Sequence, residues 1–199
     1  MLISFPLQGY GTYSIILSSV HTLCSFAFII LFFRATACSS SIALILAKTA
    51  LLFCALSSIG PFGLGYFKSN GLEHSNLYRF AIYFYLHFQY NGFFFFGILS
   101  LFIKLMEDSP QPHSGNRVRR ACYVLVGACV PAYFLSILWS RPSVVFNVIG
   151  FLTGAVQLAA FCMILQPIKT FINHAHLSSA ARLLYSLSFV ALAMKFILQ

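Results

Sequence analysis

The chain has 199 residues, of which 60% are hydrophobic and only 8% are charged. Soluble domains carry roughly 25% charged residues, so this composition excludes a water-soluble globular protein and predicts a chain buried mostly in lipid. The formal charge of +9 does not indicate nucleic-acid binding, because the basic residues fall in the breaks between apolar segments. There they anchor and orient membrane helices and attract anionic lipid head groups.

Six apolar segments are long enough to cross a bilayer, since a spanning helix needs about 20 mostly apolar residues. A closed barrel is excluded because the segments are too long for its strands and do not alternate apolar with polar residues. The sequence therefore predicts an all-α polytopic transmembrane helix bundle of about six spans, in a single domain over residues 1–199. The predicted spans are Tyr13–Phe33, Ser41–Ile59, Phe80–Ile103, Ala121–Trp139, Val144–Leu165 and Ala181–Leu198.

Short polar or Gly/Pro-rich breaks separate the predicted spans. The Gly60-Pro61 pair is expected to stop the second span and open a loop that runs to Arg79. The longest polar stretch is Lys104–Arg120, and Gln166-Pro167 begins the fifth connection. Most loop Lys and Arg residues fall in the first, third and fifth connections. The positive-inside rule places these in the cytoplasm, which predicts an inner-membrane protein with both termini outside.

Two histidines occur at similar predicted depth in the first and third spans. His21 continues a stripe of small polar residues, Ser14, Ser18 and Ser25, along one face of its helix. His87 follows the expected outer end of the third span, near Phe80, by about 7 residues or roughly 10 Å. Two imidazoles on separate helices at one depth are what axial ligation of a b-type haem requires.

The third span is polar on two sides. Tyr83, His87, Tyr90 and Asn91 share one helical face, whereas Gln89 points to the other. A helix with polar groups on two faces suits a central element that other helices contact all round. In a haem or metal site, the two tyrosines and the asparagine would surround the ligating imidazoles and orient them.

Four further polar residues are embedded in predicted spans. Asn147 and Gln157 lie on the fifth span, where Gly150 and Gly154 predict close helix packing. Lys48 lies about 7 residues into the second span and is expected to snorkel to the interface. A retinal Schiff base on such a lysine would need a carboxylate counter-ion, and no predicted span contains one. Lys195 is expected near the outer end of the sixth span.

The scarcity of acidic residues limits the chemistry. The chain has three acids, Glu73, Glu107 and Asp108, and all are expected in loops. Proton pumps, cation-coupled carriers and carboxylate-based hydrolysis use buried carboxylates, so these classes are disfavoured. The sequence also lacks a P-loop, an HExxH motif and a Ser-His-Asp set with recognisable spacing.

The segment Tyr85–Phe93, YLHFQYNGF, resembles a motif in an uncharacterised family of bacterial multi-pass membrane proteins. The last five residues, Lys195–Gln199, resemble the middle of that family's chains, which implies that the sequence is the N-terminal part of a longer bundle. Histidine-bearing helices of this kind are also similar to haem-copper oxidase subunit I. That family's histidine pairs are not all present, so oxidase activity does not carry over, and the resemblance implies a longer respiratory-type or haem-associated membrane protein.

Three functions follow from these patterns as hypotheses. The first is a redox-type membrane protein that binds haem b or a transition metal through His21 and His87, with Tyr83, Tyr90 and Asn91 around them. The second is a small-molecule transporter or permease-like subunit that uses the same polar layer. The third is a structural membrane subunit without a site, which packs against a membrane-protein partner or the remainder of a longer chain.

Overall fold

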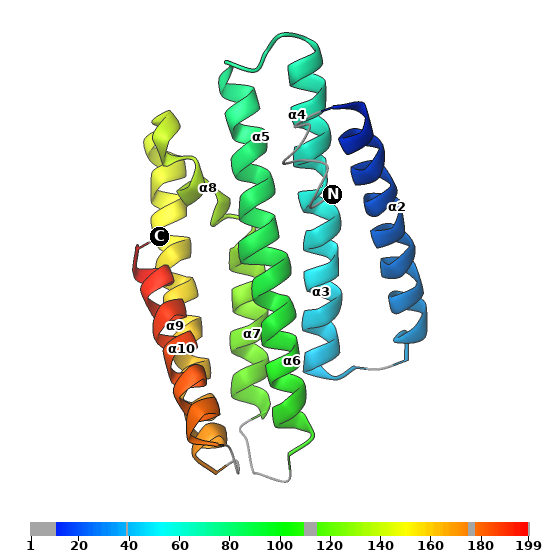
Figure 1. Ribbon diagram of the computed structural model, residues 1–199. Coiled ribbons are helices and arrows are strands. Elements are labelled where there is room, and N and C mark those ends of the chain that lie inside the picture. Colours follow the sequence, from blue (N-terminus) through cyan, green and yellow to red (C-terminus); the bar gives the residue numbers. More distant parts are fainter. Residues whose placement is uncertain (1–10, 39, 110–114, 175–177, 199) are drawn as a thin grey trace.

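The computed structural model describes residues 11–38, 40–109, 115–174 and 178–198. Every regular element in these ranges is helical, and the helices form an elongated bundle (Figure 1). In chain order the elements are α2 (Thr12–Ala35), α3 (Ile42–Ser57), α4 (Ile59–Ser69), α5 (Asn76–His87), the π-helix η1 (Phe88–Phe94), α6 (Phe95–Glu107), α7 (Gly115–Cys129), α8 (Tyr133–Ser136), the short 3-10 helix η2 (Leu138–Ser140), α9 (Val144–His174) and α10 (Ser179–Leu198).

Within the described ranges, four helical stretches are long and apolar enough to cross a membrane. This finding confirms a helical membrane bundle, but it does not support the predicted count of about six spans. The stretches are Thr12–Ala35, Ile42–Ser69, Asn76–Glu107 and Val144–Asn173.

The sequence predicts that the second span stops at Gly60-Pro61, but in the structure the helical path continues past this pair. Helix α4 begins at Ile59, directly after α3, and continues to Ser69. Pro61 lies in the first turn of α4, where a backbone N–H has no partner within the helix, so proline is tolerated there. Gly60 packs closely against α5, because a Cβ atom at this position would lie 2.6 Å from the Cβ of Tyr85.

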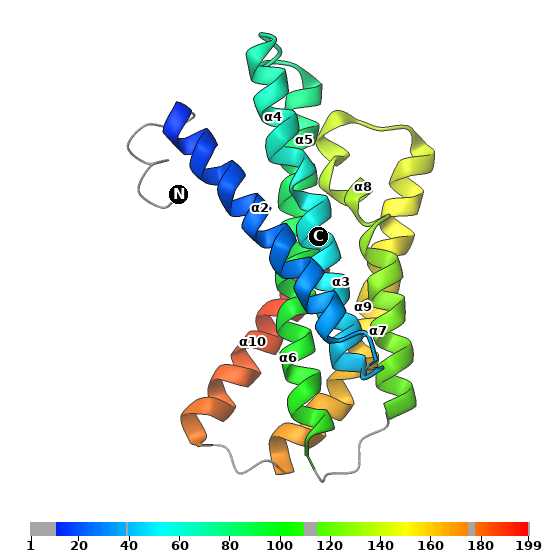
Figure 2. The ribbon, with the colours of Figure 1, turned by 90° about the vertical axis from the view of Figure 1, so that its right-hand side faces the viewer.

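The fourth predicted span is broken in the structure. Helix α7 starts at Gly115, inside the segment predicted as a loop, and ends at Cys129. Pro131 follows, and it cannot donate a helical hydrogen bond. The chain then makes only the short helices α8 and η2 before α9 (Figure 2). The window Ala121–Trp139 is therefore not one continuous helix.

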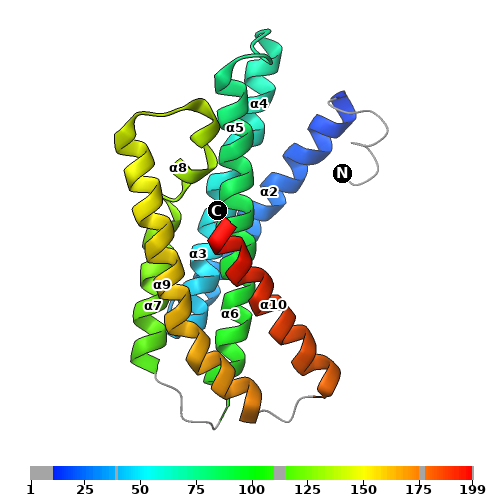
Figure 3. The same ribbon diagram turned by 90° about the vertical axis from the view of Figure 1, so that its left-hand side faces the viewer.

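The last two helices also differ from their windows. Helix α9 begins at Val144 as predicted but passes through Pro167 and ends at His174. Helix α10 is close to its predicted range, yet it lies obliquely and ends beside the middle of the bundle (Figure 3). Lys195 lies in the last turn of α10, near the end of that helix as expected, but this end lies beside the middle of the bundle (Figure 3).

The core lies between α3, the η1–α6 segment, α7 and α9. Phe53 of α3 illustrates the packing, because its ring stacks on those of Phe88 and Phe96 at centroid distances of 5.6 and 5.7 Å. Helices α2 and α10 cross the outside of this core obliquely (Figures 2 and 3). In α2 only Ser14 is buried, so most of its apolar surface is left for lipid.

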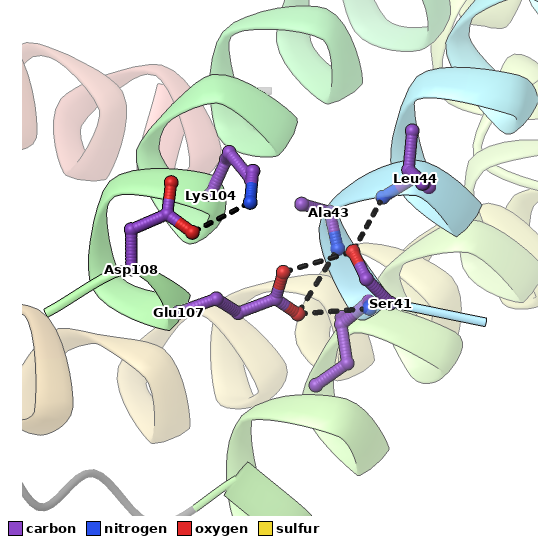
Figure 4. A network of polar contacts seen from close by, with 7 residues as sticks. Ser41, Ala43, Leu44, Lys104, Glu107 and Asp108 are labelled. Carbon is purple, nitrogen blue, oxygen red and sulfur yellow. Dashed lines mark hydrogen bonds and ion pairs between the residues drawn. The ribbon is translucent and has the colours of Figure 1, made fainter. Parts of the chain in front are cut away.

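One end of the bundle collects the C-terminal ends of α2, α6 and α9 with the N-terminal ends of α3, α7 and α10 (Figure 1). There Glu107 of α6 caps α3 (Figure 4). One carboxylate oxygen of Glu107 accepts hydrogen bonds from the backbone N–H groups of Ile42 and Ala43, at 2.9 and 3.4 Å, and the other accepts from Ser41 Oγ at 2.8 Å. These donors belong to the start of α3 and have no partner inside that helix.

Candidate functional site

His87 is the centre of a buried polar cluster between α5, α7 and α8. Its side chain is only 2% exposed. The Nε2 atom lies 2.9 Å from the backbone carbonyl oxygen of Cys129, and the Nδ1 atom lies 3.0 Å from Ser136 Oγ and 3.1 Å from Asn91 Nδ2. A carbonyl can only accept, so Nε2 carries the proton and Nδ1 accepts from Asn91 or Ser136. The cluster thus satisfies a neutral imidazole on both nitrogens.

The break after α7 explains why the Cys129 carbonyl needs this donor. In a continuous helix the N–H of Tyr133 would bond to it, but that N–H instead bonds to the carbonyl of Val130 at 3.1 Å. A buried carbonyl without a partner is costly in an apolar environment. His87 supplies the missing donor from another helix, so the imidazole closes the end of α7.

The π-helix η1 follows His87 directly and carries Gln89, Tyr90 and Asn91. Its wider turn loosens the regular hydrogen-bond ladder, and such segments are frequent at functional sites. The carbonyl oxygen of Asn91 faces the thiol of Cys129 at 3.5 Å, which adds a second link to α7. Gly92 allows the approach of α3, because a Cβ atom there would lie 2.6 Å from the Cβ of Phe53.

Gln89 contacts α3, which packs on the other side of this helix from α7 and α8. Its Oε1 atom accepts a hydrogen bond of 2.8 Å from Ser57 Oγ on α3. His87 and Asn91 face α7 and α8, so polar contacts leave the third span on two sides, as its sequence pattern suggested. The helix is a central element that ties α3 to the α7–α8 region.

A cavity of about 370 Å³ lies beside this cluster, between η1, α6, α9 and α10. Asn91, Tyr90 and Lys195 supply polar groups at its wall, and Lys195 Nζ lies 5.6 Å from the centroid of the Phe95 ring. Asn91 lies near the middle of the 32-residue stretch Asn76–Glu107, so the cavity lies at mid-depth of that stretch. Ser188 of α10 adds a hydroxyl, and the rest of the wall is apolar or aromatic: Phe94, Ile98, Leu99, Phe102, Phe161, Tyr185, Phe189 and Leu192.

The structure does not bring His21 and His87 together. His21 is exposed on α2 and lines a different cavity, of about 280 Å³, with Cys24, Cys54 and Phe93. Within the described ranges no three His, Cys, Asp or Glu side chains are grouped so that they could hold a metal ion. Both nitrogens of His87 face protein atoms, so ligation would require this imidazole to leave Cys129, Ser136 and Asn91. The observed geometry gives haem or metal ligation by this pair no support.

The two predicted tyrosines lie away from the imidazole. The ring of Tyr83 stacks on Trp139 at 5.5 Å, and Tyr90 is exposed beside Phe94 and the 370 Å³ cavity. The aromatic ring that packs against His87 from α8 is that of Tyr133, at 5.8 Å. Its hydroxyl donates to the carbonyl of Phe80 at 3.1 Å, which ties α8 to α5.

The other embedded polar residues have separate roles. Lys48 Nζ donates to the carbonyl of Thr36 at 2.8 Å, next to the end of α2, and its snorkelling to the membrane interface stays a prediction. Asn147 is exposed, and its side-chain nitrogen lies 3.5 Å from the carbonyl of Pro142. Gln157 is buried at 5% exposure, and its Oε1 atom has no hydrogen-bond partner in the described part of the chain. Gly150 and Gly154 pack against Leu135 of α8.

Sequence reasoning missed Ser136, the Cys129 carbonyl and the mid-depth position of Lys195. The signal for the first two was Pro131, which marks a helix end inside an apolar window. No sequence signal gave the oblique path of α10, because it depends on how that helix packs on α9.

Comparison with protein-family models, curated proteins and solved structures finds no match to this chain. The resemblance of Tyr85–Phe93 to a bacterial membrane-protein family therefore stays a prediction.

Proposed function

We propose that this protein binds a small anionic amphiphile, with one apolar chain and a carboxylate head, in the cavity beside η1. The observation that carries the proposal is a lysine, Lys195, in the wall of a mostly apolar cavity at mid-depth of the bundle. Ionisable groups at such depth are costly to embed in lipid and usually serve a function.

The shape and lining of the cavity favour a slender apolar ligand. Its volume of about 370 Å³ is near the lower end of the range for small-molecule sites, roughly 300–1,000 Å³. Aromatic side chains dominate the wall, and Phe102 alone packs edge to face with Phe171, Tyr185 and Phe189. A single chain suits this space better than a two-chain lipid.

The charge of the cavity favours an anion. Lys195 is the one charged residue in its described lining, which contains no carboxylate. One ammonium balances one carboxylate, whereas a phosphate monoester carries about −1.5 to −2 charges near neutral pH. Asn91 and Tyr90 add hydrogen-bonding groups beside the head group, and Asn91 connects the cavity to His87.

Of the three hypotheses, small-molecule transport is the one that requires such a cavity, and the cavity supports the ligand-binding step of transport. Haem or metal binding by His21 and His87 stays a prediction without geometric support. A structural subunit without a site stays the third hypothesis.

We extend the proposal to topology. The basic end of the bundle, with Arg34, Lys104 and the start of α7, would face the cytoplasm under the positive-inside rule. Helices α7–α8 and α10 would complete a bundle of six membrane-embedded segments in an inner membrane. The bilayer then surrounds the exposed apolar faces of α2 and α9.

Binding can be tested with cis-parinaric acid, a fluorescent single-chain carboxylic acid, added to the full chain in detergent micelles. The wild-type protein should raise its fluorescence in a saturable manner, and dodecanoate should displace it while dodecyltrimethylammonium should not. Lys195→Met should weaken binding about tenfold or more through loss of the charge pair. Ser188→Phe should also weaken it, because the new ring would enter the cavity while Lys195 remains.

Lys48→Met is the matched control, since this lysine is also embedded but contacts Thr36 outside the cavity. It should bind cis-parinaric acid like the wild type. Equal affinity in the wild-type, Lys195→Met and Ser188→Phe proteins would refute the proposal.

A further inference from the structure

A third cavity, of about 290 Å³, lies between α9 and α10 toward the basic end of the bundle. Lys169 and Asn173 line it from α9, and Arg182 and Ser186 line it from α10. Leu165, Ile168 and Phe189 give it an apolar wall. It therefore combines two cations from different helices with a surface that suits hydrocarbon.

We infer that this cavity binds the phosphate head group of an acidic phospholipid, with Lys169 and Arg182 on the phosphate and an acyl chain along the apolar wall. Basic pockets between membrane helices are suited to anionic lipid head groups. The guanidinium of Arg182 can offer two parallel N–H donors to phosphate oxygens, and Lys169 adds a point charge. The described lining contains no carboxylate that would compete for these cations.

The partners of neighbouring basic residues strengthen this assignment. At the same end, Lys104 pairs with Asp108 at 2.6 Å, Arg117 donates to Gln166 at 3.0 Å and Arg119 contacts the carbonyl of Ser40. Within the described ranges the structure gives the side chains of Lys169 and Arg182 no hydrogen-bond or ion-pair partner. Both side chains are exposed at the cavity, so an anion from outside the chain can reach them.

A phospholipid fits better than a free phosphate ion. The apolar residues would gain nothing from a small hydrated ion, and the cavity lies between α9 and α10, which the proposed topology embeds in lipid. The site is independent of the proposed carboxylate cavity, although Phe189 lines both. Its test therefore leaves Lys195 and Phe189 unchanged.

The test is native mass spectrometry of the full chain in detergent, titrated with phosphatidylglycerol or with phosphatidylcholine of the same acyl chains. The wild-type protein should bind at least one phosphatidylglycerol about tenfold or more tightly than phosphatidylcholine. Lys169→Gln combined with Arg182→Gln should reduce phosphatidylglycerol affinity about 25-fold, since each basic residue near an anionic lipid contributes about fivefold. Lys169→Arg combined with Arg182→Lys keeps both charges and should bind within a few-fold of the wild type.

The matched control is Arg34→Gln combined with Arg120→Gln, which removes the same charge from the same end of the bundle outside the cavity. It should retain tight phosphatidylglycerol binding. The inference is overturned if the two glutamine pairs lose affinity equally or neither loses any. It is also overturned if millimolar inorganic phosphate displaces the lipid, because the site would then select the ion alone.

Discussion

Single polar residues in this protein join helices that the chain separates. His87 is the clearest case, because its imidazole bonds to groups that lie 42 and 49 residues further along the sequence. In lipid a polar group finds no water, so it is stable only where another part of the chain supplies a partner. The polar residues of the third span therefore indicate where neighbouring helices are close.

Replacement of His87 by alanine should destabilise the protein by about 1–3 kcal/mol, because the buried Cys129 carbonyl would lose its donor. Denaturation with sodium dodecyl sulfate, followed by circular dichroism, would measure the change. His21→Ala is the control and should shift the transition by less than about 0.5 kcal/mol, since His21 is exposed. Equal effects of the two substitutions would contradict the structural role assigned to His87.

Glu107 also joins two helices, because its carboxylate accepts hydrogen bonds from the start of α3 at one end of the bundle. Glu107→Ala should lower the free energy of unfolding by about 1–2 kcal/mol, because the first N–H groups of α3 would lose their acceptor. Asp108→Ala is the neighbouring control. It breaks only an exposed ion pair with Lys104 and should change the thermal transition in detergent much less. The reverse order of the two effects would show that Glu107 does not cap α3.

At the scale of elements, glycine and proline set where helices approach and where they end. Pro131 ends α7 and so creates the open carbonyl that His87 meets, whereas Pro61 begins α4 without breaking the path of α3. The two prolines have opposite effects on the helical path, because Pro131 follows a helix end whereas Pro61 lies in a first turn. A reading of the sequence that treats Gly-Pro pairs as stops therefore misplaces the second span.

Gly92→Ala should be destabilising by about 1–3 kcal/mol, because its Cβ atom would collide with Phe53 and force α3 away from η1. Gly97→Ala is a matched control on the next helix, since a Cβ atom there meets nothing within 4 Å. That substitution should be neutral or stabilising by up to about 1 kcal/mol, as alanine favours helix. Sodium dodecyl sulfate titration of both variants would measure the difference, and equal stability would argue against the close contact.

The whole molecule has a packed centre and two oblique outer helices. The core of α3, η1–α6, α7 and α9 holds the polar cluster, while α2 and α10 leave apolar faces open. Both proposed ligand cavities lie where α10 meets the core. Ligands that fill them would hold α10 in its oblique position.

The orientation proposed for the bundle predicts which thiol a membrane-impermeant maleimide reaches. Cys38 is exposed in the turn after α2, at the basic end, so it should react in inverted vesicles but not in intact cells. A variant with Cys38→Ser and Asn70→Cys moves the thiol to the α4–α5 turn and should show the reverse pattern. Labelling of Cys38 in intact cells would overturn the assignment.

The sequence by itself determined that this chain is a helical membrane protein, because its composition leaves no alternative to burial in lipid. It also located the helical starts near Thr12, Ile42 and Val144, and showed that the third span is polar on two faces. These properties depend on hydrophobicity and periodicity, which are set by residues close to one another in the sequence.

Only the tertiary structure decided which polar groups meet. It separated His21 from His87, paired His87 with Cys129 and Ser136, and placed Lys195 and Asn91 in the wall of one cavity. Helix crossing angles and the break at Pro131 set these contacts, and both depend on packing between segments far apart in sequence. For that reason the sequence could identify a layer of polar residues. The hydrogen-bond partners of these residues, and the cavities beside them, could be found only in the folded bundle.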